Sequence, residues 1–109
     1  MAEPGCSAVL VFGDREATVV QTRLMAAGVQ VPQQMSIISY DDETAALAPI
    51  PLTAIAPAKY QLGKLAARNL LRRIRHGGEI PIEQTYLRPV LKVRGSTAQK
   101  QPPHRPNGV

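Results

Sequence analysis

The sequence predicts an α/β fold built on a parallel sheet, and three observations support this prediction. A continuous apolar run, Ala8–Phe12, is typical of a buried strand, an amphipathic stretch then ends at Gly28, and a second apolar run follows at Met35–Tyr40. A strand, a helix and a strand in this order form a βαβ unit, whose two strands are expected to be parallel.

The first strand and helix of this unit have recognisable ends. The run AVLVF contains no polar residue, so we expect it to be buried on both faces of the sheet. Gly13 and Asp14 end the run, and Asp14 is a plausible N-cap, with Glu16 in the first helical turn, where the helix dipole favours an acid. Gly28 is expected just beyond the helix, where a left-handed residue is common.

The second half of the sequence predicts one more helix and further extended pieces. Residues 41–51 are expected to form a loop, and Leu52–Ile55 a third short strand. Pro57 suits the first position of a helix whose apolar residues recur at i, i+3, i+4 and i+7 until Gly77. Two extended pieces, IEQTYL and VLKV, follow, and a polar tail is expected to be disordered from about residue 98.

Composition limits the class of protein. The chain has 109 residues, of which 44% are hydrophobic, enough for one small domain with a core. The single cysteine, Cys6, excludes an internal disulfide, fits a reducing compartment and is expected to be a free thiol. No apolar run approaches the ~20 residues that span a bilayer, and the start MAEPGCS has no signal-peptide features. We therefore expect a cytoplasmic protein without a membrane partner.

The net charge of +5 is concentrated on the second predicted helix. Arg68, Arg72 and Arg75 lie on the side opposite its apolar residues. A solvated helix face explains this cluster, and a nucleic-acid surface is the alternative.

Acidic residues follow the first two predicted strands. Asp14 comes at the end of the first, and Asp41 and Asp42 come after the second. Ligands of open α/β sheets bind beyond the carboxyl ends of the strands, so acids on neighbouring strands approach one crevice. A carboxylate accepts hydrogen bonds from hydroxyl or N–H groups, which suits a sugar, nucleoside or base. Asp41 is the better candidate; capping is the alternative for Asp14 and the preferred explanation for Asp42.

Catalytic and metal sites are not supported by the sequence. Magnesium phosphatases and phosphate receivers also place acids at strand ends, but DxD spacing and a partner lysine after a later strand are absent. The sequence also has no Ser-His-Asp spacing, Cys-His pair, P-loop or GxGxxG motif. We expect no enzyme, no cofactor and no metal site.

Five stretches occur in an order that resembles a known family. AVLVFGDREAT, GVQVPQQMSIISYDDE, PLTAI, KYQLGKLA and VRGST are similar, at similar spacing, to stretches of LacI/GalR-family transcriptional regulators. The corresponding family stretches read roughly AVFxxNDxxA, GLxVPxDISVVGFDD, PLTTI, a helix containing LG, and RGST. Each stretch alone is weak, but five in register over most of the chain are specific.

The resemblance implies a periplasmic-binding-protein-like pair of Rossmann-like α/β lobes with an effector in the cleft, of which this chain holds the last third. Residues 8–56 would belong to the C-terminal lobe, 57–88 to the other lobe, and 89–97 to a returning strand. Residues 1–7 would be a lead and 98–109 a disordered tail. In the family, a helix-turn-helix headpiece precedes these lobes and binds operator DNA.

The resemblance also implies site residues. Asp41 matches the aspartate that contacts effector hydroxyls or ring nitrogens, and Asp14 matches the Asp of the ND motif. The Asn of that motif is Gly13 here, a departure that removes an amide from the pocket. Tyr40 matches the aromatic residue before the aspartate, and Lys59 falls near an aromatic position over the ligand, where a cation would suit a phosphorylated or acidic effector.

The helix at 14–27 matches a helix at the family's dimer interface. Thr18, Thr22 and Met25 leave its outer side uncharged, which also suggests, without the resemblance, a second buried contact with another subunit.

The leading hypothesis is therefore the effector-binding and dimerisation region of a transcriptional regulator, whose partners are a small-molecule effector, a second copy and, through a headpiece, operator DNA. A periplasmic-type sugar-binding protein of the same fold is the alternative. Direct nucleic-acid binding through the basic helix is a third hypothesis.

Overall fold

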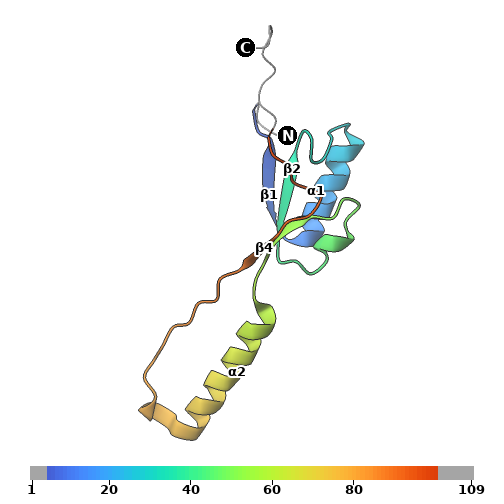
Figure 1. Cartoon of the computed structure of the whole chain (residues 1–109). Coiled ribbons are helices and arrows are strands. Elements are labelled where there is room, and N and C mark those ends of the chain that lie inside the picture. The colour runs from blue at the N-terminus through green and yellow to red at the C-terminus, as the bar shows by residue number, and fades with distance from the viewer. Residues whose placement is uncertain (1–4, 101–109) are drawn as a thin grey trace, which may run out of the picture.

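The computed structural model describes residues 5–100 (Figure 1). Along the chain lie the strand β1 (Ala8–Phe12), the helix α1 (Asp14–Ala26), β2 (Ser36–Tyr40), the 3-10 turn η1 (Ala45–Leu47), β3 (Thr53–Ala56), the helix α2 (Lys59–His76), the 3-10 turn η2 (Gly77–Glu79) and β4 (Val90–Lys92). The boundaries of β1, α1, β2 and β3 lie within two residues of the predicted ones, which is the usual uncertainty of such boundaries.

The strands form one sheet in the order β1-β2-β3-β4. β1 pairs with β2 and β2 with β3 in parallel, with Val9 opposite Ile37 and Ser39 opposite Ala54. β4 pairs with β3 antiparallel. The α/β fold with a mostly parallel sheet and a β1-α1-β2 unit is thus confirmed.

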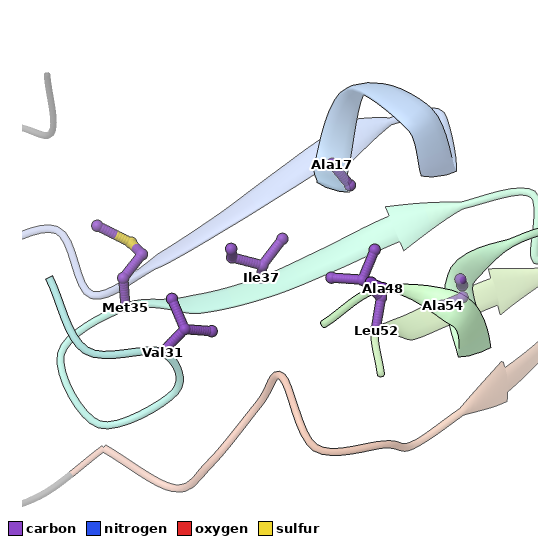
Figure 2. Packing of buried hydrophobic residues seen from close by; sticks show 8 residues of the cluster. Ala17, Val31, Met35, Ile37, Ala48, Leu52 and Ala54 are labelled. Atoms are coloured by element: carbon purple, nitrogen blue, oxygen red, sulfur yellow. The ribbon is translucent and has the colours of Figure 1, made fainter. Parts of the chain in front are cut away.

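The core lies between α1 and one face of the sheet. Figure 2 shows the aliphatic side chains of this layer, which come from α1, β2, β3 and the loops between them. The buried hydrophobic residues are Ala17, Val31, Met35, Ile37, Ala45, Ala48, Leu52 and Ala54. Their burial is the main stabilisation available to this part of the chain.

The opposite face of the sheet is open. Leu10 is 61% exposed and Phe12 is 80% exposed, so the prediction that the first strand is buried on both faces is wrong within these residues. The reason is that α1 covers one face, and no second helix among residues 5–100 packs on the other (Figure 1). The Phe12 ring instead stacks on that of Tyr40, with ring centroids 4.7 Å apart.

Helix ends follow the sequence in part. α1 ends as predicted: Gly28 has a φ of 86°, its N–H donates to Met25 O, and the next N–H, of Val29, donates to Leu24 O, which is a Schellman motif. The prediction that Asp14 is the N-cap is wrong, because Gly13 occupies that position and no side chain caps the helix, whereas Glu16 lies in the first turn as predicted. The start of α2 also differs from the prediction: the helix begins at Lys59, two residues after Pro57, and not at the proline itself.

The molecule has two parts of different character. The sheet unit consists of β1–β4, α1 and residues 94–98, and the arm consists of residues 57–89, which contain α2, η2 and an extended return segment. The arm points away from the sheet unit (Figure 1). The radius of gyration is 20.3 Å, compared with about 13 Å for a compact domain of similar length.

The arm contains no buried residue. The piece IEQTYL, predicted to be extended, lies in a segment without strand pairing among the described residues. A strand needs a neighbour to accept its backbone hydrogen bonds, and none lies beside it in the arm. The predicted disordered tail falls on residues 98–109, of which 101–109 lie outside the described residues, and Ala98 N–H donates to Ser36 Oγ.

Candidate functional site

The loop after β2 leaves the sheet through an unusual backbone turn. Asp41 has a φ of 127° and Asp42 a φ of 63°, values that residues other than glycine rarely adopt. The Asp41 N–H donates to Ile55 O at 2.9 Å, so it continues the pairing with β3. Backbone strain of this kind persists only where surrounding contacts hold it, and it is concentrated at functional sites.

Asp14 holds this loop from the start of α1. Its carboxylate is buried and accepts hydrogen bonds from the Ser39 hydroxyl and from three successive backbone N–H groups of the loop, those of Asp42, Glu43 and Thr44. Burial by itself raises the pKa of this carboxyl, but the hydrogen bonds, led by that from Thr44, outweigh burial and hold the pKa below its ordinary value. Both oxygens of Asp14 are thus engaged within the chain.

Arg94 holds the loop from the returning segment. Its guanidinium lies 2.7 Å from Asp42 Oδ1 and donates to Leu52 O at 2.8 Å. The hydrogen bond to Asp42 raises the pKa of Arg94. Asp42 therefore serves as an ion-pair partner, and the prediction that it caps a turn is wrong, since the N-cap of η1 is Thr44, without a side-chain hydrogen bond.

Asp41 points into a second ion-pair cluster. Lys59 Nζ lies 2.7 Å from Asp41 Oδ1 and 2.9 Å from Glu43 Oε1. The Asp41 side chain is 42% exposed, in contrast to that of Asp14. The hydrogen bonds to Asp41 and Glu43 raise the pKa of Lys59, so the lysine is a firmly charged partner of the loop.

A solvent-open hollow of about 370 Å³ lies at the carboxyl end of β1 and β2. Its lining residues are Gly13, Asp14, Arg15, Glu16, Asp41, Glu43 and Thr44. Of the predicted ligand-binding residues, Gly13, Asp14 and Asp41 lie together here, and Lys59 joins them through Asp41. Tyr40 is not part of the lining, and its ring stacks on Phe12. Whether any of these residues contacts an effector stays a prediction.

Gly13 has a backbone conformation that explains its identity. Its φ is 115° and its ψ is 134°, a region that only glycine adopts without strain. An added Cβ would also clash with the Glu16 carboxylate, which would have to move. An asparagine would therefore be strained at this position, so the loss of the motif's amide is coupled to the local chain path.

The outer side of α1 carries the predicted dimer contacts. The hydroxyls of Thr18 and Thr22 donate to the carbonyl oxygens one turn earlier in their own helix, Asp14 O and Thr18 O. Met25 is 42% exposed. These side chains form an uncharged surface available for a contact, and the dimer interface stays a prediction.

Several residues that shape the site were not identified from the sequence. Gln21 is fully buried and exchanges hydrogen bonds with both the N–H and the carbonyl of Ile50. Ser96 is also fully buried, and its hydroxyl accepts from Thr53 N–H and donates to Ile37 O. The quoted RGST stretch signalled the position of Ser96 and Arg94, but the roles of these residues depend on contacts more than forty positions apart along the chain.

Comparison with known protein families identifies the domain. The family model described as a periplasmic binding protein-like domain matches residues 2–97. The chain belongs to this family. Within it, the chain corresponds to part of the effector domain of LacI-family regulators, as the following relatives indicate.

The ribose operon repressor of Escherichia coli K12 is 39% identical over 90 residues, which are 82% of this chain and 27% of the repressor. A LacI family transcriptional regulator from Enterococcus faecium with bound ribose superposes with a TM-score of 0.75 at 31% identity, over 84% of this chain and 34% of that one. The transcriptional regulator CelR in complex with cellobiose gives a TM-score of 0.76 at 31% identity, over 85% and 28%. The chain spans about a quarter of the length of the curated relatives it matches.

Proposed function

We propose that this chain is the part of a LacI-type transcriptional regulator that binds a small-molecule effector and contributes to dimerisation. The observation that carries the proposal is Asp41, a half-exposed carboxylate held by a strained backbone turn at the mouth of an open hollow. Its neighbour Asp14 has both oxygens engaged, so Asp41 is the carboxylate free to exchange its partner for a ligand.

A sugar or related polyol is the effector class that this site favours. A carboxylate accepts hydrogen bonds from two neighbouring hydroxyls at once. Solved structures of relatives carry ribose and cellobiose, and a curated relative is a ribose operon repressor. We propose the same class of ligand for this chain.

The regulatory step would be a shift between two arrangements of the lobes. The arm and the sheet unit are joined through β3 and β4, and a ligand that prefers one arrangement shifts the population toward it. Operator DNA would be bound by a headpiece, and two copies would meet through the uncharged side of α1, near Thr18 and Met25. We expect such a regulator to act in the cytoplasm. Neither helix within residues 5–100 has the length and hydropathy of a membrane span.

The test uses a chimera in which these residues replace the matching part of the Escherichia coli ribose operon repressor. We expect ribose to release the chimera from operator DNA. Asp41→Asn, which keeps the size of the side chain, should weaken the response to ribose by about ten- to hundredfold, because hydrogen bonds to a charged acceptor are lost. Operator affinity without ribose should stay unchanged.

Glu83→Gln removes an exposed acid of the arm and serves as the matched control, with an expected response equal to that of the parent chimera. An Asp41→Asn chimera that responds at the same ribose concentration as the parent would contradict the assignment of Asp41. A chimera that binds operator but is never released by ribose would contradict the proposed effector class.

A further inference from the structure

The effector carboxylate already has a partner within the chain. Lys59 is the first residue of α2, and its ammonium bridges Asp41 and Glu43 on the loop after β2. An ammonium has three donors, and two of them are directed at these carboxylates. One oxygen of Asp41, Oδ1, is therefore already taken by Lys59, and a ligand whose hydroxyls donate to both carboxylate oxygens would compete with the lysine for it.

The acid is fixed and the lysine is movable. Asp41 is held by its N–H bond to Ile55 O and by the turn that Asp14 and Arg94 clamp. Lys59 has a long flexible side chain that is 43% exposed. A ligand that binds both oxygens of Asp41 would therefore displace the ammonium from Oδ1 and leave the carboxylate in place, with Lys59 still paired to Glu43.

The charges around the hollow limit which ligands can do this. Four carboxylates, those of Asp14, Glu16, Asp41 and Glu43, face two cations, Arg15 and Lys59. The positive charge of Lys59 is already balanced by two of these acids, Asp41 and Glu43, so it is not available to hold a phosphate. An anionic ligand would meet net repulsion, which is strong at such short distances. This argues against the earlier interpretation that Lys59 suits a phosphorylated or acidic effector.

We propose that Lys59 is a specificity-determining residue of the Asp41 site: as an internal counter-ion it is displaced by neutral polyhydroxylated effectors, and phosphorylated ones are rejected. This inference rests on the proposed function, because it assumes that Asp41 receives the effector. It adds that binding competes with an ion pair. The affinity for an uncharged sugar should consequently depend on salt concentration.

The first measurement needs no ligand. In the 109-residue chain, lysine side-chain carbon signals followed by NMR report the pKa of Lys59. We expect this pKa to fall in Asp41→Asn and further in Asp41→Asn combined with Glu43→Gln, because the hydrogen bonds that raise it are removed. A Lys59 pKa that is the same in the wild type and in both variants would contradict the role of Lys59 as counter-ion of Asp41.

The second measurement uses D-ribose and ribose 5-phosphate as probes, titrated into the same chain and followed at the Asp41 amide. Raising the salt concentration from about 0.01 M to about 1 M screens the ion pair between Lys59 and Asp41. The wild type should therefore bind D-ribose several-fold more tightly at the high salt concentration than at the low one. Lys59→Met should bind D-ribose several-fold tighter than the wild type at low salt, with no salt dependence. At low salt, ribose 5-phosphate should bind at least about tenfold more weakly than D-ribose.

Lys64→Met is the matched control, because Lys64 lies on the same helix and has no ion pair recorded within residues 5–100; it should follow the wild type. Ribose 5-phosphate binding as tightly as D-ribose, or D-ribose binding that Lys59→Met weakens, would overturn the inference. If neither sugar binds the wild type or Lys59→Met, the proposed function fails for this chain, and the selectivity fails with it. The pKa of Lys59, measured without ligand, shows independently whether the ion pair with Asp41 exists, so failure of the proposed function can be distinguished from absence of the ion pair.

Discussion

The sheet unit and the arm belong to one chain, but only the sheet unit buries apolar side chains. In the sheet unit, Ile37 and Leu52 are completely buried. In the arm, Leu70 is 61% exposed and Ile74 is 70% exposed, although both lie on the apolar face predicted for α2. Apolar periodicity thus correctly predicts a helix in both parts. Among the described residues, however, only the helix of the sheet unit has a surface on which its apolar face packs.

The largest expected effect contrasts one leucine from each part. Leu52→Ala removes a fully buried side chain next to β3 and should lower the free energy of unfolding by about 2–5 kcal/mol. Leu70→Ala in α2 should change it by less than about 0.5 kcal/mol, because that side chain is already in solvent. Urea unfolding of the 109-residue chain measures both. Equal destabilisation by the two variants would mean that the arm is packed in solution.

The next effect concerns the anchor of the loop. The Asp14 carboxylate accepts hydrogen bonds from Ser39, Glu43 and Thr44. In Asp14→Asn the negative charge is lost, and the new NH2 group, itself a donor, would face donors. We expect a loss of about 2 kcal/mol in the free energy of unfolding. Glu83→Gln in the arm is the control and should leave the unfolding midpoint unchanged. A stable Asp14→Asn variant would show that the loop does not depend on this carboxylate.

The same residue predicts a dependence on pH. The pKa of Asp14 is lower in the folded chain than its ordinary value of 3.8, so the unfolded chain binds the proton first as the pH falls. The stabilisation from Asp14 is complete above about pH 4 and is lost as the pH falls through the folded-state pKa. Unfolding curves between pH 7 and pH 2 should show this loss in the wild type, and a smaller loss in Asp14→Asn.

The smallest effect should be confined to the arm. Gly63 lies inside α2, without a positive φ, and an added Cβ would meet nothing within 4 Å. Gly63→Ala should therefore favour the helix by about 0.5–1 kcal/mol. We expect higher helix content by circular dichroism near the melting of the arm, with the unfolding midpoint of the sheet unit unchanged. A shift of that midpoint would contradict the separation of the two parts.

Local sequence signals predicted most of the elements. The apolar runs at 8–12 and 36–40 gave β1 and β2, and Gly28 and Gly77 gave the helix ends, because these features depend on neighbours in the chain. The open face of β1 was not predicted, since a continuous apolar run does not reveal whether both covering layers lie in the same stretch of chain.

The candidate site was predicted less completely. Asp41 and Asp14 were found because each follows a strand, and the parallel pairing of β1 with β2 brings the two ends together. The N-cap prediction for Asp14 was wrong, because a carboxylate after a strand has the same local signature whether it caps its own helix or binds a distant loop. Gln21 and Arg94 were overlooked for a related reason: their partners, Ile50 and Asp42, are far away in the sequence.

The antiparallel pairing of β4 with β3 has a consequence for how the chain can vary in length. Ala56 and Val90 are direct partners in the sheet, so the chain leaves and re-enters the sheet unit at adjacent points, and the arm is in topological terms the loop of a β-hairpin. Closing a hairpin through a loop of this length costs only about 2.5 kcal/mol more than through a two-residue turn, because the entropic cost grows with the logarithm of loop length. Insertions or deletions inside residues 57–89 would therefore leave the strand register intact, and the arm can diversify without altering the sheet that supports Asp41.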